Sequence, residues 1–202
     1  MKFMILGSGM QGRACAFDLV RNPETESVLL ADASAANLAS AKTFLKSKKV
    51  ETLQVDASDT KKIAESALGR DVLVSCVPYF LNLELAKAAI AAKVHFVDLG
   101  GNTDIVLEEL KLGPQAAKAG VTLLPDVGLG PGMTTTLAVH GMSQLDTVTE
   151  VLIRDGGLPQ KPRPPMNYLL TFSEHGLINE YVSDATAIRD GKLVTVPGLS
   201  ET

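Results

Sequence analysis

Glycines near the start of the chain have the spacing of a dinucleotide-binding turn. They form a G-x-G-x-x-G string between the apolar run KFMIL and a helical pattern. In such a turn the first glycine allows a tight bend, the second lets a pyrophosphate approach the backbone, and the third lets the helix pack against the strand. The alternative is a Gly-rich turn that binds no dinucleotide, but the flanking strand and helix favour binding. The predicted cofactor contacts here are Gly7, Ser8, Gly9, Met10, Gln11 and Gly12.

An acidic residue follows where the ribose of such a cofactor would lie. Asp32 ends the second apolar run, twenty residues after Gly12. A carboxylate at this point can accept hydrogen bonds from both ribose hydroxyls of an adenosine. Because the same charge would repel a 2′-phosphate, the sequence predicts NAD rather than NADP as the cofactor.

Further candidates stand where the later strands of a parallel sheet would end, which is the edge where ligands bind. Asp56 follows the third apolar run and could contact adenine or cap a turn. Asp98 and Asp126 close the fifth and sixth runs, in DLGGN and DVGLGPGM. Asp-Gly is also ordinary turn chemistry, but both aspartates are candidate catalytic residues, with Asp126 ahead of Asp98. The predicted cofactor contacts after the fourth run are Cys76, Val77 and Pro78.

The elements that must position these residues alternate between apolar runs and helical patterns. Such regular alternation predicts right-handed βαβ units and a parallel sheet covered on both faces. The expected fold class is therefore α/β: a Rossmann doubly wound parallel sheet followed by part of a second α+β domain. The sequence predicts strands at 2–6, 27–32, 50–56, 71–77, 94–99 and 121–126, with helices between them.

The pattern changes after residue 130, so we expect a dinucleotide-binding domain over 1–130 and a partial substrate-binding and dimerisation domain over 131–202. Asp190-Gly191 predicts the turn of a β-hairpin. The expected elements of the second part are a helix at 131–145, strands at 146–155 and 166–173, a helical turn at 174–181 and the hairpin at 185–196.

Composition excludes several classes of function. The net charge is −4 and basic residues form no stripe, so nucleic acid is not an expected partner. The apolar runs are too short to span a membrane, and a cytoplasmic location is expected. The histidines and the two cysteines lack metal-ligand spacing, so no metal site is predicted.

Several motifs together resemble the saccharopine dehydrogenase superfamily, and most closely its lysine 6-dehydrogenase-like branch. In chain order these are GSGMQGRACAFDL, FVDLGGNTD, LLPDVGLGPGM, GGLPQKPRPPMNY, GLINEY and IRDGK. The resemblance implies an N-terminal Rossmann domain and a second domain that supplies substrate binding and dimer contacts. Members are longer than this chain, so the resemblance also implies that the chain stops midway through the second domain.

The implied activity is NAD-dependent oxidative deamination of the ε-amine of L-lysine to the 6-semialdehyde, with a small amino acid as partner and a homo-oligomeric assembly. Two alternatives remain open: a reductive enzyme that condenses an amine with an aldehyde, as for saccharopine or carboxynorspermidine, and a truncated NAD-binding remnant without activity. The candidate substrate contacts are Arg154, Tyr168, Ser173 and Glu180.

Overall fold

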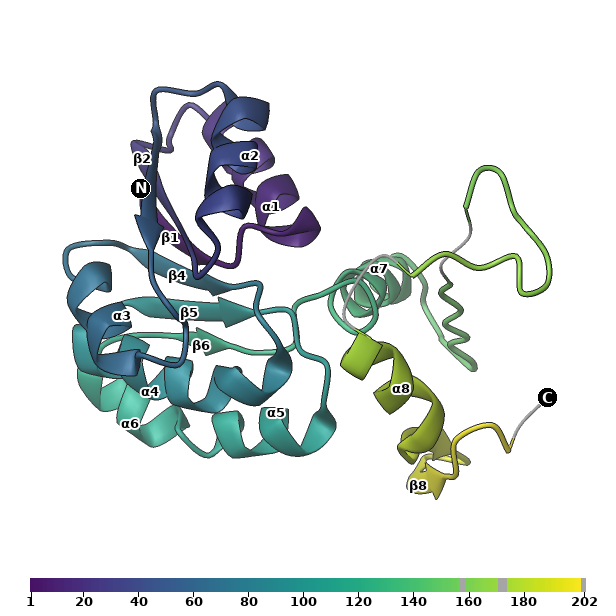
Figure 1. Cartoon of the computed structure of the whole chain (residues 1–202). Helices are drawn as coiled ribbons and strands as arrows, with labels where there is room; N and C mark the ends of the chain where they lie inside the picture. Colours follow the sequence, from purple (N-terminus) through teal and green to yellow (C-terminus); the bar gives the residue numbers. More distant parts are fainter. Residues whose placement is uncertain (157–158, 171–173, 201–202) are drawn as a thin grey trace. The chain divides into compact units, whose positions relative to one another are not determined.

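The computed structural model describes residues 1–156, 159–170 and 174–200. The chain divides into two compact units, Met1–Gly156 and Gly157–Thr202. The boundary expected after residue 130 lies inside the first of these units. The first unit holds the whole parallel sheet (Figure 1).

Six strands form a single parallel sheet in the order β3-β2-β1-β4-β5-β6, which is the doubly wound topology expected from the sequence. Each of the six strands predicted for the first domain is present, although the sixth is shorter than predicted and pairs only with β5. The strands are β1 Lys2–Leu6, β2 Ser27–Asp32, β3 Val50–Gln54, β4 Val72–Ser75, β5 His95–Asp98 and β6 Leu123–Leu124.

Helices cover both faces of the sheet because its strands are apolar on both sides. In β1, Ile5 packs with the helices α1 and α2 on one face, whereas Met4 and Leu6 pack with α3 and α4 on the other. Figure 1 shows α5 and α6 on the same side as α4. These helices are α1 Met10–Arg21, α2 Ala35–Leu45, α3 Thr60–Ala67, α4 Asn82–Ala92, α5 Thr103–Leu110 and α6 Gly113–Ala119.

The strand register brings the predicted site residues to one edge of the sheet. Leu6 pairs with both Ala31 and Ser75, and Ser75 pairs with Asp98. The glycine turn, Asp32 and the Asp98 loop therefore leave the sheet at the same carboxyl edge. Crossovers run in opposite directions from β1 and β4, and that point is where doubly wound sheets bind ligands.

The rest of the chain differs from expectation in two places. Residues 146–155 and 166–170, predicted as strand, have no regular secondary structure. Their apolar alternation is not sufficient, because a strand also needs a hydrogen-bonded neighbour. The helix at 131–145 and the hairpin at Asp190-Gly191 are confirmed. The elements are α7 Met133–Met142, α8 Glu174–Val182, β7 Ala185–Arg189 and β8 Lys192–Val196.

Membrane insertion of a helix finds no support in the described part of the chain. None of its helices combines the length and the apolar character that crossing a bilayer requires.

Candidate nucleotide-binding and catalytic site

The glycines of the first turn are required for different physical reasons. Gly7 has a φ of +89°, and a Cβ built on it would stand 2.7 Å from the carbonyl oxygen of Cys76. A Cβ on Gly12 would overlap the carbonyl oxygen of Gly7. Around Gly9, in contrast, a Cβ would meet nothing within 4 Å. The chain's own packing therefore does not require glycine at position 9, and the open space there suits a group that approaches from outside.

The helix that follows this turn keeps its N-terminus available to an anion. Gly9 is the N-cap of α1, no side chain caps the helix, and its first turn carries no acidic residue. The first N–H groups of a helix have no partner within the helix, and its dipole favours negative charge there. An open glycine and an uncapped helix end are the features that bind a pyrophosphate.

Asp32 ties the end of β2 to the glycine turn. Its Oδ2 accepts hydrogen bonds from the backbone N–H of Ser8, at 2.7 Å, and from the Ser8 hydroxyl, at 2.8 Å. Its Oδ1 accepts the N–H of Ser34 at 2.7 Å. The Asn37 side chain also hydrogen-bonds to this carboxylate. A carboxylate has about four lone-pair sites, so the chain's own donors occupy all of them. The ribose contacts expected from the sequence would require the Ser8 hydroxyl and the Asn37 side chain to turn away.

Asp32 is ionised at neutral pH. Burial by itself would raise the pKa of this carboxyl, but the N–H groups of Ser8 and Ser34 and the Ser8 hydroxyl together hold it below its usual value. Within the described residues Asp32 forms no ion pair. A phosphate on the adenosine ribose would therefore meet a full negative charge that no neighbouring cation compensates.

The residues that follow β4 lie next to the glycine turn. Cys76 is half-buried, and its carbonyl oxygen leaves no room for a Cβ at Gly7. Cys76 donates its backbone N–H to the carbonyl oxygen of Leu6 at 2.8 Å. Val77 packs against the core, and Pro78 begins the 3-10 turn Tyr79–Leu81. Their predicted contact with the cofactor stays a prediction, but their position beside the turn agrees with it.

Asp56 is occupied by a local turn. Its Oδ1 accepts the backbone N–H of Ser58 at 2.9 Å and the Ser58 hydroxyl at 2.8 Å. These hydrogen bonds lower the pKa of the Asp56 carboxyl. The side chain is exposed, so the capping role weighed from the sequence is present, whereas the adenine contact stays a prediction.

The two aspartate-glycine loops interlock through Asp98. This residue is fully buried, and its Oδ1 accepts the N–H of Gly100 at 2.6 Å and the N–H of Asp126 at 3.1 Å. The N–H of Val127 in turn donates to the carbonyl oxygen of Asp98 at 2.9 Å. Asp98 therefore connects the loop after β5 to the loop after β6, and its burial suits positioning rather than contact with substrate.

Asp126 packs against Gly100 in the loop after β5. This loop lies at the carboxyl edge of the sheet, where ligands bind. Asp126 is half-buried, has a φ of +64°, and its carboxylate accepts the N–H of Gly101. A Cβ on Gly100 would overlap its Oδ1. Burial and the charge of Asp98 raise the pKa of the Asp126 carboxyl, although the Gly101 hydrogen bond opposes this. A carboxylate with a raised pKa is a better proton acceptor than an ordinary aspartate.

Glu109 was not among the site residues predicted from the sequence, but it lies near Asp98 and Asp126 at the end of α5. Only 1% of this residue is exposed, and its pKa is raised to about 8 by burial and by the charges of Asp98 and Asp126. A signal was present, since Glu109 stands one helical turn after Ile105 and continues an apolar face. Among the described residues no cluster of three or more His, Cys, Asp or Glu could hold a metal ion.

The predicted substrate contacts are divided between the two units of the chain. Arg154 is exposed in a stretch without regular structure at the end of the first unit. Tyr168 and Glu180 belong to the second unit, and Ser173 lies outside the described residues. Their role in substrate binding stays a prediction.

Comparison with known proteins assigns this arrangement to a family. Residues 3–124 match the model described as "Saccharopine dehydrogenase NADP binding domain", and residues 128–202 match "Saccharopine dehydrogenase C-terminal domain". The chain belongs to the saccharopine dehydrogenase family. The predicted superfamily is therefore confirmed, and the family's members are amino-acid oxidoreductases.

Two curated relatives illustrate the likeness. Saccharopine dehydrogenase [NADP(+), L-glutamate-forming] of Saccharomyces cerevisiae is 26% identical over 199 residues, which cover 96% of this chain and 43% of the yeast protein. The mitochondrial alpha-aminoadipic semialdehyde synthase of Rattus norvegicus is 26% identical over 98% of this chain and 21% of its own length. The chain thus spans less than half the length of these saccharopine dehydrogenase family relatives.

Solved structures agree on the fold. The apo saccharopine dehydrogenase (L-Glu forming) of S. cerevisiae superposes with a TM-score of 0.70 at 24% identity, covering 97% of this chain and 44% of that one. A WlbA dehydrogenase from Chromobacterium violaceum, in complex with NADH and UDP-GlcNAcA, has a TM-score of 0.52 at 16% identity, covering 71% and 40%. The Rossmann architecture expected from the sequence is therefore confirmed.

Proposed function

We propose that this chain carries the dinucleotide-binding part of an oxidoreductase that acts on a C–N bond of an amino acid and uses NAD(H) in preference to NADP(H). The observation that carries the proposal is the geometry of Asp32, an ionised carboxylate at the end of β2 that is held against the glycine turn by the Ser8 N–H and hydroxyl. An unphosphorylated ribose would donate a hydroxyl to this carboxylate in place of the Ser8 hydroxyl or the Asn37 side chain.

The cofactor preference departs from the names of the saccharopine dehydrogenases among the relatives, which specify NADP(+). An NADP site usually offers a basic residue to the 2′-phosphate near the end of the second strand. Here Asp32 is followed by Ala33 and Ser34. Arg13, in the first turn of helix α1, instead donates to the Ser40 hydroxyl at 3.2 Å. These contacts support NAD.

Amine oxidation also needs a proton acceptor. A bound NAD would accept the hydride from the carbon that bears the nitrogen. The nitrogen must first lose its proton, and a lysine amine titrates near about 10.4 in water. Asp126 is the residue best placed to take this proton, because it is half-buried at the carboxyl edge and its pKa is raised. Asp98 would position Asp126 through its backbone N–H.

Two substrates fit this chemistry. The relatives' names favour the secondary amine saccharopine, whose cleavage in those proteins forms L-glutamate. The second candidate is the ε-amine of L-lysine, as in the lysine 6-dehydrogenase-like branch, and the NAD preference expected from Asp32 favours it. The alternative of an inactive remnant is decided by the same assay.

The test begins with cofactor binding by the 202-residue chain. NADH should bind more tightly than NADPH by about tenfold or more, which corresponds to about 1.4 kcal/mol. Asp32→Asn should narrow this gap because it removes the charge. The control is Asp71→Asn, a change of equal charge before β4, where the Asp71 carboxylate accepts the N–H of Lys2 at the opposite end of the strands. Equal affinity, or tighter NADPH binding, would contradict the proposal.

Substrate choice is then measured with the product of the complete open reading frame. Saccharopine and L-lysine are compared with NAD as oxidant, and NADH formation is followed by absorbance. Turnover of either substrate supports amine oxidation and names the branch. NADH binding without turnover of either substrate would identify a cofactor-binding remnant and overturn the catalytic proposal.

A further inference from the structure

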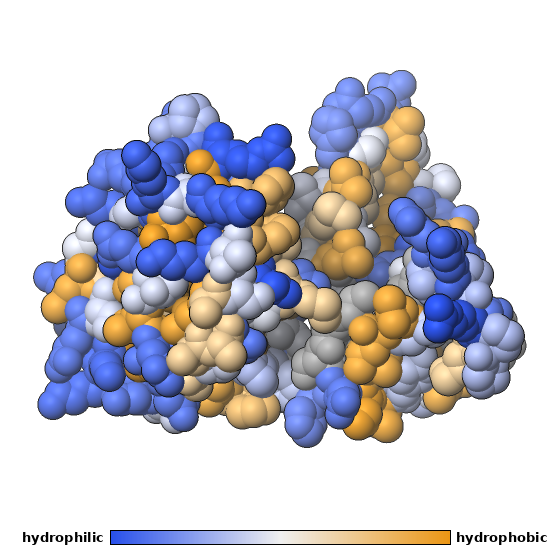
Figure 2. All heavy atoms as spheres, turned by 45° about the horizontal axis from the view of Figure 1, so that its top comes forward, coloured by the Kyte–Doolittle hydropathy of each residue, from blue (hydrophilic) through white to orange (hydrophobic). Residues whose placement is uncertain are grey.

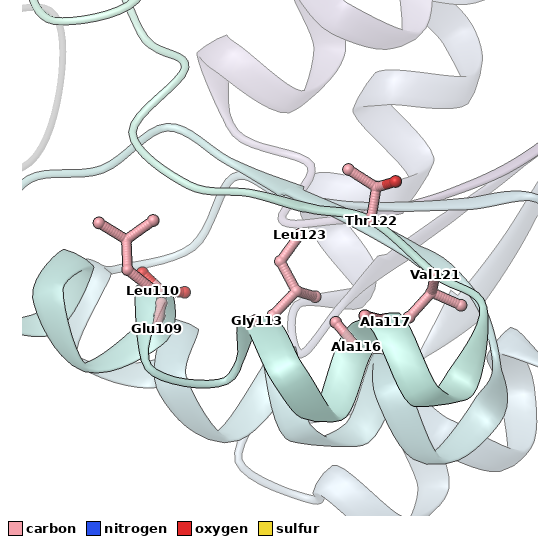
Figure 3. A pocket seen from close by; sticks show the side chains of 8 residues that line it. All are labelled: Glu109, Leu110, Gly113, Ala116, Ala117, Val121, Thr122 and Leu123. Carbon is pink, nitrogen blue, oxygen red and sulfur yellow. The ribbon is translucent and has the colours of Figure 1, made fainter.

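Glu109 is an acidic side chain enclosed within the first unit. It belongs to the last turn of α5, and only 1% of the residue is exposed. It lines a hollow of about 240 Å³ together with mostly apolar side chains from α5, α6 and the chain leading into β6. Figure 3 shows Glu109 at one end of this set of side chains. Neither of its carboxyl oxygens has an N–H or hydroxyl partner in the described structure.

The group that Glu109 meets is another carboxyl. Its side chain lies within hydrogen-bonding reach of Asp98. The Oδ2 of Asp98 is buried and, like the Glu109 oxygens, lacks any other partner in the described structure. Two carboxyls in contact form a hydrogen bond only if one of them carries a proton. The contact between Asp98 and Glu109 therefore requires a proton between them.

The surroundings decide which of the two residues holds that proton. Asp98 Oδ1 accepts the N–H groups of Gly100 and Asp126, and hydrogen bonds of this kind favour its ionised form. Glu109 has no such donors. The charged groups that face it are Asp98 and Asp126, and within the described residues neither Glu109 nor Asp98 forms an ion pair. A second negative charge here would be uncompensated.

Resting on the function proposed above, we propose that Glu109 is a positioning residue for Asp126. As a neutral acid it donates its proton to Oδ2 of Asp98, and the Asp98 carboxylate holds the N–H groups of Gly100 and Asp126 with its other oxygen. The proton on Glu109 thus keeps the loops after β5 and β6 together. Its loss would leave Asp98 and Glu109 as two adjoining buried charges next to Asp126, the candidate proton acceptor.

The pH dependence follows from the direction of the shift. Burial, with the charges of Asp98 and Asp126, raises the pKa of Glu109 from 4.5 to about 8. A carboxyl whose pKa is higher in the folded state stabilises the fold fully below its unfolded value, and this stabilisation is lost as pH rises through the folded value. The Glu109 contribution to stability should therefore decline between pH 4.5 and about 8. In the folded chain the two loops should loosen as the pH rises through about 8, where Glu109 itself loses its proton.

Nuclear magnetic resonance of the 202-residue chain tests this without cofactor or substrate. The carboxyl carbon of Glu109 should titrate near pH 8, and the amide protons of Gly100 and Asp126 should shift with the same midpoint. In Glu109→Gln the amide N–H donates at every pH, so both amide shifts should lose this titration. The matched control is Glu108→Gln. It removes the neighbouring, exposed carboxylate of α5, which pairs with Lys111, and the Gly100 and Asp126 amides should then titrate as in the parent chain.

The outcomes separate this inference from the proposed function. A Glu109 carboxyl that titrates near 4.5, or amides at Gly100 and Asp126 that ignore its titration, would overturn the inference. If Glu109→Gln fails to fold, the carboxyl titration of the parent chain still decides. Failure of NADH binding would contradict the proposed function and leave these titrations unaffected.

Discussion

At the scale of single residues, the site depends on backbone atoms that side chains must not obstruct. Gly9 and Gly12 offer a direct comparison, because they flank the same turn and differ in what surrounds them. The space at Gly9 is open, whereas the space at Gly12 is filled by the backbone of Gly7. The proposed roles of these two glycines can therefore be separated by experiment.

Gly12→Ala should destabilise the chain by about 1–3 kcal/mol, as other overpacking substitutions do. Gly9→Ala should cost less than about 1 kcal/mol, chiefly because alanine is a poorer N-cap, yet it should weaken NADH binding because its methyl group enters the phosphate space. Urea unfolding and an NADH titration of both variants measure this. Gly9→Ala with unchanged NADH affinity would show that no phosphate approaches this residue.

Asp126 is the residue whose chemistry the proposal needs most. Asp126→Asn keeps a side chain that tolerates its φ of +64° but removes the proton acceptor. In the complete protein it should lower kcat by about tenfold or more, since general bases contribute about 10²–10⁴-fold, with NADH affinity nearly unchanged. Asp104→Asn, in the first turn of α5, is the control of equal charge. Full activity of Asp126→Asn would reduce Asp126 to a turn residue.

At the scale of elements, sequence periodicity predicted the sheet well because each βαβ unit is encoded locally. The apolar runs at 2–6 and 27–32 are strands with the expected bounds. The run at 146–155 is not, since pairing depends on a distant neighbour that the run itself does not specify. Glu109 was missed for a related reason: charge suggested exposure, and its burial depends on the loop after β6.

Side chains cap the N-termini of α5, which follows the loop after β5, and of α2, which follows β2. Asn102 caps α5 by accepting the N–H of Ile105 at 3.2 Å, and Ser34 caps α2 by accepting the N–H of Asn37 at 3.2 Å. Asn102→Ala and Ser34→Ala should each cost about 0.5–2 kcal/mol. Of the two, Asn102→Ala should also change the Glu109 titration, because α5 positions that carboxyl. An unchanged Glu109 titration in Asn102→Ala would show that the cap does not position it.

At the scale of the whole molecule, the first unit holds every strand of the parallel sheet and both aspartate-glycine loops. The helix that follows these loops, α7, exposes apolar side chains. Helix α7 has no buried residue, and Met133, Leu137 and Val139 are each more than half exposed. Figure 2 shows hydrophobic side chains interrupting the hydrophilic surface. Large exposed apolar patches usually mark surfaces that associate.

Self-association is therefore the expected behaviour of the 202-residue chain, in agreement with the homo-oligomer predicted from the sequence. The apparent mass from size-exclusion chromatography with light scattering should rise with protein concentration. Leu137→Gln should reduce this association because it removes an exposed apolar side chain from α7, whereas Thr135→Gln on the same helix should not. Because α7 buries none of its side chains, neither change should alter the unfolding transition of the sheet. A monomer at every concentration, with Leu137→Gln indistinguishable from the parent, would show that the apolar side chains of α7 do not bring copies of the chain together.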